Sequence, residues 1–229
     1  MRRLAVALAL LLAPAACGTG GTGVTVAAAA SLTEAFEALG GATFSFTGSQ
    51  QLAAQVEARA PVDVVATADV DAMERLVGAG LVEAPATFAR NRLAIAVATG
   101  NPARIGGLAD LGRPGLKVVL ADPAVPAGRY TRLALDRAGV VVRPVSLELD
   151  VKAVARTVAV GEADAGIVYV TDVPAAARVD IPAGANVVAT YPVAVVRATG
   201  DRAGAQAFVD RLLGPAGRSA LAAHGFELP

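Results

Sequence analysis

The chain has 229 residues, of which 55% are hydrophobic, with 24 Gly, 13 Pro and a formal net charge of zero from 20 basic and 20 acidic residues. This length and apolar content predict one compact α/β domain or two small lobes with ample material for a core. The charge balance gives no electrostatic case for binding nucleic acid or an acidic membrane surface. The scarcity of aromatic residues (six Phe, three Tyr and no Trp) argues against platforms on which bases stack.

The N-terminus has the pattern of a bacterial export signal. Two arginines precede an apolar run, 4–13, that is too short to span a bilayer. Small residues then lead to Cys17, the single cysteine, as at a lipoprotein cleavage site. We therefore expect a signal peptide over 1–17, a lipid on Cys17, and a location outside the cytoplasmic membrane, either anchored to it or periplasmic. An ordinary secretory signal with an incidental cysteine is the alternative. Residues 18–23 (GTGGTG) predict a flexible tether.

From Val24 onward, segments typical of strands alternate with segments typical of helices. The expected strands are 24–28, 43–46, 62–66, 93–98, 117–121, 140–144, 165–170, 187–189 and 192–197. The expected helices are 32–39, 52–59, 70–77, 129–137, 151–160, 202–213 and 216–224. This alternation predicts parallel sheets covered on both faces, with ligands bound at the carboxyl ends of the strands.

Two serines stand where a strand ends and a helix opens. Ser31 and Ser49 would bring two hydroxyls and two helix N-termini to one edge of a sheet. Helix N-termini present free N–H groups and the positive end of the helix dipole, so this arrangement predicts an anion site without a basic residue. The plain alternative is capping: Ser31 and Glu34 fit a capping box, and Ser49 fits an N-cap after Gly48.

Three later features have equally ordinary interpretations when each is taken alone. Residues 124–128 (AVPAG) form a tight turn before a helix, and Asp150 is placed to cap the next one. Tyr169 closes the apolar strand AGIVYV, where a tyrosine is usually part of the core.

The order of these segments resembles a known family. From Val24 to Phe226 the chain is similar to the ModA-type molybdate-binding proteins of bacterial ABC importers. The similarity is carried by AAAASLTEAF (27–36), GSQQLAAQVEARAPVDVVATAD (48–69), ADPAVPAGRYTRLAL (121–135), EADAGIVYVTD (162–172), YPVAVV (191–196) and the closing LLGPAG…HGF (212–226).

The resemblance implies a two-lobed periplasmic-binding-protein fold of the type with two chain crossings, at 93–98 and 191–196. Lobe I would hold 24–92 and 196–229, and lobe II 93–195. One tetrahedral oxyanion would sit between the lobes. Its implied ligands are the hydroxyls of Ser31 and Ser49, the amides of Ala127 and Val151, and the hydroxyl of Tyr169. Gln50 and Gln51 replace the small hydroxyl residues that often follow the second serine, so they would crowd or supplement the site.

The implied function is capture of molybdate or tungstate and delivery to an ABC permease, by a monomer that is not an enzyme and needs no cofactor or cation ligand. A site made of donors suits a fully deprotonated dianion. The same fold binding another oxyanion, such as sulfate, is the first alternative. A secreted hydrolase using Ser31 or Ser49 is a poor alternative, because the one histidine, His224, lies near the C-terminus and neither serine is in GxSxG. A signalling protein with a vestigial cleft is the third alternative.

Overall fold

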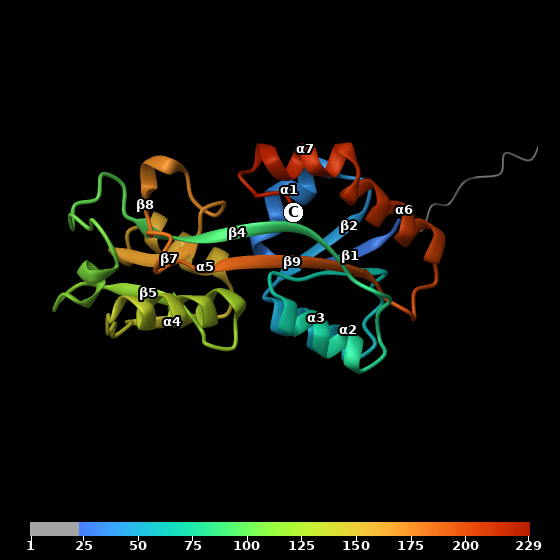
Figure 1. Ribbon diagram of the computed structural model, residues 1–229, viewed down its shortest axis with the longest axis horizontal. Coiled ribbons are helices and arrows are strands. Elements are labelled where there is room, and N and C mark those ends of the chain that lie inside the picture. The colour runs from blue at the N-terminus through green and yellow to red at the C-terminus, as the bar shows by residue number, and fades with distance from the viewer. Residues whose placement is uncertain (1–22) are drawn as a thin grey trace, which may run out of the picture.

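The computed structural model describes residues 23–229, so the predicted signal peptide, Cys17 and most of the predicted tether lie outside the described residues. Two α/β lobes lie side by side along the long axis of the molecule (Figure 1). The strands are β1 (Thr25–Ala29), β2 (Thr43–Thr47), β3 (Val64–Ala66), β4 (Ala86–Val97), β5 (Val118–Ala121), β6 (Ser146–Glu148), β7 (Ala165–Tyr169), β8 (Arg178–Asp180) and β9 (Val188–Val195). The α-helices are α1 (Thr33–Leu39), α2 (Ser49–Glu57), α3 (Val70–Gly78), α4 (Pro126–Ala138), α5 (Val151–Ala159), α6 (Arg202–Leu213) and α7 (Pro215–Ala223). Three short 3₁₀ turns are η1 (Ala30–Leu32), η2 (Leu108–Gly112) and η3 (Ala175–Ala177).

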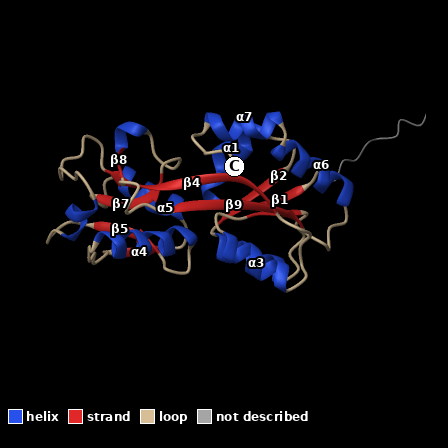
Figure 2. Ribbon diagram, in the orientation of Figure 1, coloured by secondary structure: helices blue, strands red, loops and turns tan. Residues whose placement is uncertain are grey.

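The strands form one hydrogen-bonded series in the order β2-β1-β3-β9-β4-β7-β5-β6, and β8 pairs with β4. We call the part built on β1, β2, β3, α1–α3, α6 and α7 the first lobe, and the part built on β5–β8, α4 and α5 the second lobe. Within the first lobe β1 is parallel to β2 and β3, and within the second lobe β5 is parallel to β6 and β7. The predicted parallel sheets are therefore present, one in each lobe, and helices lie on both sides of the strands (Figure 2).

Two long strands, β4 and β9, connect the lobes (Figure 1). β4 pairs antiparallel with β9 over its first half and with β7 over Leu93–Val97. β9 continues to pair with β3 through Val193–Val195. Both strands pass between the lobes without a break, so the residue limits predicted for the lobes, 92/93 and 195/196, stay a prediction.

Four predicted strands differ from the structure, and one of them, expected at 93–98, begins earlier, at Ala86. The strand expected at 140–144 is wrong: it forms instead at Ser146–Glu148, in register with β5, and Val141 in the apolar run before it is 81% accessible. The strands expected at 187–189 and 192–197 are one strand, β9. Pro192 is tolerated inside β9 because the ladder with β4 shifts register between Thr87 and Ala89.

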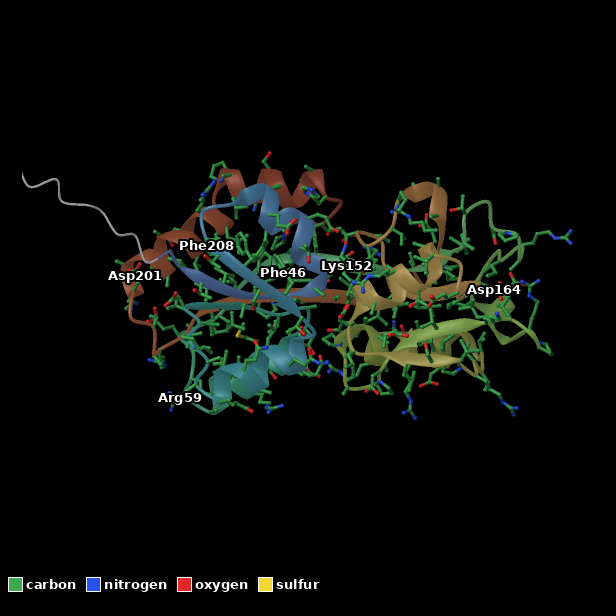
Figure 3. The ribbon with its side chains drawn as sticks, turned by 180° about the vertical axis from the view of Figure 1, so that it is seen from behind. Phe46, Arg59, Lys152, Asp164, Asp201 and Phe208 are labelled. Carbon is green, nitrogen blue, oxygen red and sulfur yellow. The ribbon has the colours of Figure 1, made fainter. Side chains whose placement is uncertain are left out.

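The first lobe is held together by aromatic packing between its outer helices and the sheet. Phe36 of α1 is fully buried, and its ring lies 5.8 Å from Phe44 of β2 and 5.9 Å from Phe208 of α6. Burying each such side chain contributes roughly 1.5–3 kcal/mol. Phe208 and Phe46 are labelled in this lobe in Figure 3. Among residues 23–229, no helix has the length and apolar character needed to cross a membrane.

Candidate functional site

A small cavity lies between the lobes, where the carboxyl ends of β1, β2 and β3 face those of β5, β6 and β7. Its empty volume is about 220 Å³. It is lined by Ala29, Ala30, Ser31, Thr47, Gly48, Ser49, Ala68, Val125, Pro126, Ala127, Asp150, Val151 and Tyr169. All five predicted ligand positions are in this lining, although they come from segments far apart in the chain. No Lys or Arg lines this cavity in the described part of the chain.

Ser31 lies in the 3₁₀ turn η1 that follows β1, and its hydroxyl does not cap a helix. The predicted capping box is wrong, because α1 begins only at Thr33 and no side chain caps its start. Ser31 is buried, and its Oγ lies 3.0 Å from the hydroxyl of Tyr191 on β9. Glu34 instead points away from the helix start and pairs with Lys152, 2.8 Å away.

Ser49 is the first residue of α2, so the predicted N-cap is also wrong. The N-cap is Gly48, which has no side chain to bond. Ser49 is buried, and its Oγ accepts a hydrogen bond from the Ala68 amide at 2.9 Å. A backbone N–H can only donate. The hydroxyl hydrogen of Ser49 is therefore left to donate to another group, and Ser49 lines the cavity.

The second lobe brings two helix N-termini to the cavity. Pro126 opens α4, and the first intrahelical bond of this helix is donated by Arg129 to Val125, 3.0 Å away. The amide of Ala127 lies within the first turn, where helix geometry provides no partner. The N-cap predicted at Asp150 is confirmed, since its carboxylate accepts from the Ala153 amide at 2.8 Å. That bond ties the acidic side chain in the lining to the start of α5.

Val151 is the first residue of α5, directly after Asp150. Its amide is one of the N–H groups that a helix start leaves without an intrahelical acceptor. Gly128 shows how tightly the start of α4 is placed, because a Cβ at this position would lie 2.0 Å from the carbonyl oxygen of Asp122. The two amides that face the cavity thus come from helix starts anchored to the sheet.

Tyr169, the last residue of β7, borders the cavity with a buried hydroxyl. This hydroxyl has no hydrogen-bond partner among the described residues. Burial raises the pKa of Tyr169 well above its ordinary value, so the side chain stays neutral and keeps its hydrogen. The side chain is therefore a donor for which the protein supplies no acceptor.

A buried carboxylate lies directly behind Tyr169. Asp172 accepts a hydrogen bond from the Tyr169 amide at 2.9 Å, and its other oxygen lies 3.4 Å from Nζ of Lys152. Burial raises the pKa of Asp172 to about 6, against the opposing effect of Lys152. Figure 3 shows Lys152 at the junction between the lobes. Lys152 thus joins Asp172 of the second lobe to Glu34 of the first.

Contacts across the rim hold the lobes together. Arg129 on α4 bonds to the buried carboxylate of Asp69, the N-cap of α3, and lies 3.0 Å from Asp71. Gln50 of the first lobe also donates to the carbonyl of Leu149 in the second lobe, at 3.1 Å. The cleft is therefore closed in this structure, with ion pairs or hydrogen bonds between the lobes on several sides of the cavity.

The two glutamines of GSQQL are not in the cavity lining. Gln50 spans the rim, as described, and Gln51 accepts a hydrogen bond from Thr47. Of the two predicted effects, crowding of the cavity does not occur. Gln50 instead supplements the contact between the lobes.

The sequence did not reveal three further groups: Tyr191 and Asn91 behind the cavity, and the amide of Ala68 in its lining. Tyr191 and Asn91 are buried, and they form a hydrogen-bonded chain with Ser31. The signal in the sequence is a polar side chain inside an apolar strand, which needs a partner when buried. Spacing alone does not reveal which partner it finds.

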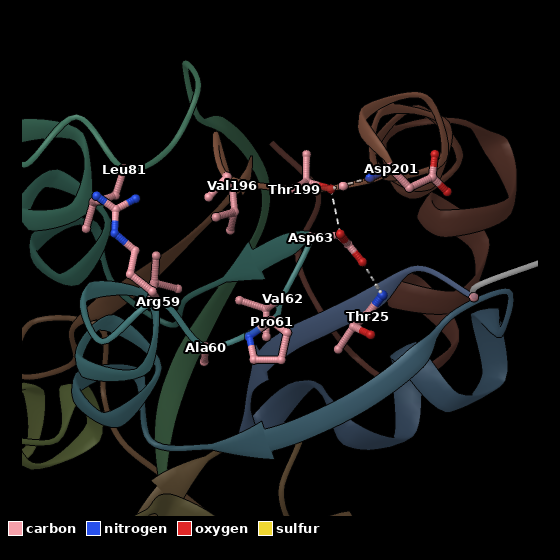
Figure 4. A pocket seen from close by; sticks show the side chains of 14 residues that line it. Thr25, Arg59, Ala60, Pro61, Val62, Asp63, Leu81, Val196, Thr199 and Asp201 are labelled. Carbon is pink, nitrogen blue, oxygen red and sulfur yellow. Dashed lines mark hydrogen bonds between the residues drawn. The ribbon is translucent and has the colours of Figure 1, made fainter.

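A larger hollow, about 1150 Å³ in empty volume, lies at the other end of the first lobe (Figure 4). Its polar groups bond to one another: Asp63 accepts from the Thr25 amide at 2.8 Å and from Thr199 at 2.5 Å. The lining of this hollow includes Asp63, Asp201 and Arg59, and it contains none of the five predicted ligand positions. Within residues 23–229 no cluster of three or more His, Cys, Asp and Glu is placed to hold a metal ion.

Sequence comparison agrees with a binding site between two lobes, because the matched proteins are solute-binding proteins. Residues 24–227 match the family described as bacterial extracellular solute-binding protein. The molybdate-binding protein ModA of Mycobacterium tuberculosis is 41% identical over 231 aligned positions, covering 94% of this chain and 88% of that protein. The ModA protein of Escherichia coli is 31% identical, covering 90% and 89%.

Solved structures confirm the fold. The periplasmic molybdate-binding protein of Azotobacter vinelandii matches with a TM-score of 0.76 and 21% identity, over 90% of this chain and 99% of that one. The sulfate-binding protein SubI of Mycobacterium tuberculosis matches with a TM-score of 0.77 and 19% identity, over 90% and 86%. The predicted two-lobed fold is therefore correct, and the fold alone does not choose between these anions. Family match and sequence identity over nearly the whole of residues 24–227 place the chain among the bacterial extracellular solute-binding proteins, in the ModA family of molybdate-binding proteins.

Proposed function

We propose that this chain captures molybdate or tungstate outside the cytoplasmic membrane and delivers it to an ABC permease. The observation that carries the proposal is the convergence of five donors on one cavity that no Lys or Arg lines in the described part of the chain. These are the hydroxyls of Ser31, Ser49 and Tyr169 and the amides of Ala127 and Val151.

The donor set favours a fully deprotonated oxyanion. Such a dianion offers only acceptors, so each donor finds a partner. Hydrogen phosphate carries a proton that needs an acceptor, and leaving a buried polar group unpaired costs about 1–3 kcal/mol. Hydrogen bonds to a charged group contribute about 1.5–3 kcal/mol each. Several of them, together with the helix N-termini, offset the dehydration of the anion without a buried cation.

Sulfate is the second candidate, because a sulfate-binding protein has the same fold. Sulfate presents the same charge and the same acceptors. The distinction then depends on the size of the anion, because a closed cleft must fit the ion that it surrounds. The higher sequence identity to molybdate-binding relatives supports molybdate and tungstate over sulfate.

Thermal unfolding with molybdate, tungstate, sulfate and phosphate tests the proposal. A ligand at 100 times its Kd adds about 2.7 kcal/mol to the free energy of unfolding. For a chain of this size that is a rise in Tm of roughly 5–10 °C. Molybdate and tungstate should produce it at micromolar excess, and phosphate should not. A rise with sulfate alone would support the second candidate, and no response to any of the four anions would contradict both.

The lipid anchor at Cys17 is a separate part of the proposal, supported by the apolar run and the small residues before the cysteine. Cys17→Ser should release the protein from the membrane fraction into the soluble fraction. A wild-type protein that is already soluble and begins at another residue would contradict the anchor and leave the anion site untouched.

A further inference from the structure

A chain of buried polar side chains runs behind Ser31, on the side away from the cavity. It consists of Asn91 on β4 and Tyr191 on β9, the two strands that connect the lobes. Both are almost completely inaccessible, at 1% and 0%. Neither side chain lines the cavity, so neither can touch an anion bound there.

The directions of the hydrogen bonds that Asn91 makes are fixed by its contact with a backbone amide. The amide of Arg92 can only donate, and it donates to Oδ1 of Asn91 at 2.9 Å. Nδ2 of Asn91 must therefore be the donor to the other two partners, Thr171 at 2.8 Å and the Tyr191 hydroxyl at 3.4 Å. The Tyr191 oxygen consequently accepts from Asn91.

The Tyr191 hydroxyl then has its own hydrogen to donate, and Oγ of Ser31 lies 3.0 Å away. In this arrangement Ser31 accepts from Tyr191, and the hydrogen of Ser31 is left for the cavity. The hydrogen of Ser49 is likewise left for the cavity, because its oxygen accepts from the Ala68 amide at 2.9 Å. Both serines have one acceptor site occupied by a donor of the protein.

We propose that Tyr191, oriented by Asn91, is a positioning residue that fixes Ser31 as a donor toward the bound oxyanion. This inference rests on the proposed function and deepens it, because it names the groups that select a fully deprotonated anion. A serine free to turn could accept the proton of hydrogen phosphate. A serine held by Tyr191 accepts from the protein and donates to the anion.

The surroundings of Tyr191 suit this role. Its ring packs edge-on against Phe226, with centroids 5.4 Å apart, and against Tyr169 at 6.0 Å. These contacts fix where the hydroxyl points. Burial raises the pKa of Tyr191 well above its ordinary value, so the hydroxyl keeps the hydrogen that it donates.

A double-mutant cycle tests the proposal by calorimetric titration with molybdate, and by competition with phosphate. The variants are Tyr191→Phe, Ser31→Ala and the two together. Tyr191→Phe keeps the ring and its packing, so it removes the hydroxyl with little other change. We expect it to weaken molybdate binding about three- to tenfold and to narrow the preference for molybdate over phosphate. In the Ser31→Ala background the same change should have no further effect, because Tyr191 acts through Ser31.

Thr171→Val is the matched control. It removes the other acceptor of Asn91 and leaves the link from Tyr191 to Ser31 in place, so affinity and preference should stay near the wild-type values. Two independent, additive losses for Tyr191→Phe and Ser31→Ala would overturn the positioning role, as would an unchanged preference in Tyr191→Phe. Wild-type binding of molybdate with either result leaves the proposed function intact. A wild-type chain that binds no molybdate would overturn the function and the positioning role together.

Discussion

In the first lobe, both hydroxyls that face the cavity are hydrogen-bonded to another group of the protein: Ser31 pairs with the Tyr191 hydroxyl, and Ser49 accepts from a backbone amide. In the second lobe the donors are two amides at helix starts and the hydroxyl of Tyr169. That hydroxyl is buried and has no partner among the described residues. The serine hydroxyls of the first lobe are bonded to other groups of the protein, whereas the Tyr169 hydroxyl of the second lobe is bonded to none among the described residues.

The difference indicates that the two lobes contribute to binding in different ways. Donors held by other groups lose little freedom when the anion arrives, so the first lobe is prepared for binding. A buried hydroxyl without a partner costs about 1–3 kcal/mol, and a bound anion would remove that cost. A ligand that relieves the closed state more than the open state shifts the lobes toward closure. We therefore expect variants in the first lobe to affect both fold and binding, and the Tyr169 hydroxyl to affect binding alone.

Ser49→Ala should have the largest effect. It removes a donor to the anion, so molybdate binding should weaken roughly ten- to a hundredfold. It also leaves the buried amide of Ala68 unpaired, so the free energy of unfolding should fall by about 1–3 kcal/mol. Calorimetric titration and urea unfolding measure the two effects on the same protein.

Ala127→Gly is the control for Ser49→Ala, because the amide survives and no side-chain donor is lost. Its affinity should stay close to that of the wild type. If Ser49→Ala binds molybdate as tightly as the wild type, the hydroxyl of Ser49 has only a structural role and the site is misplaced in the first lobe.

Tyr169→Phe should weaken binding by about ten- to thirtyfold, since one donor is lost. The free energy of unfolding of the ligand-free protein should not fall, because the change removes a buried polar atom that has no partner. The pair of variants thus separates the lobes: Ser49→Ala lowers stability and affinity, and Tyr169→Phe lowers affinity only. A loss of stability in Tyr169→Phe would show that its hydroxyl has a partner in the free protein.

Much of this arrangement follows from the sequence. The alternation of strands and helices places Ser31, Ser49 and Tyr169 at strand ends, and the strand-end rule brings them to one cleft. The roles of the serine oxygens do not follow. Their partners lie 19 and 160 residues away along the chain, and these distant groups replaced the nearby helix amides that a capping motif predicts. The local sequence shows only which nearby groups a serine can bond to, whereas the tertiary fold brought in partners from the segment after β3 and from β9.

Asp172 in the second lobe should make the stability of the protein depend on pH. Its pKa is raised from an ordinary 3.8 to about 6, mainly by burial. Because the pKa is higher in the folded state, protonation of Asp172 stabilises the fold. This contribution to the free energy of unfolding is complete below about pH 3.8 and is lost as the pH rises through about 6. Burial also raises the pKa of Asp69 at the rim, so Asp69 changes the stability with pH in the same direction.

Comparison with Asp172→Asn isolates the contribution of Asp172. Between pH 4.5 and 7 the wild type should lose on the order of 1–2 kcal/mol of unfolding free energy relative to the variant. Urea unfolding across this range, without ligand, measures the difference. Parallel pH curves for the two proteins would mean that Lys152 compensates the buried carboxylate fully.

Gly48→Ala should have the smallest effect, and it tests the contact between the lobes. A Cβ at Gly48 would lie 2.8 Å from the carbonyl oxygen of Leu149 in the second lobe, and also close to the movable side chain of Gln50. The backbone of Gly48, at φ −66° and ψ 143°, is one that alanine adopts freely, so the first lobe itself is not strained. The penalty falls on the closed state, and molybdate affinity should weaken about threefold, or about 0.7 kcal/mol. Gly107→Ala is the control, because a Cβ there meets nothing within 4 Å. Titration calorimetry gives the affinities, and small-angle scattering with and without molybdate reports closure. An unchanged affinity in Gly48→Ala would mean that the lobes do not close this tightly around the ion.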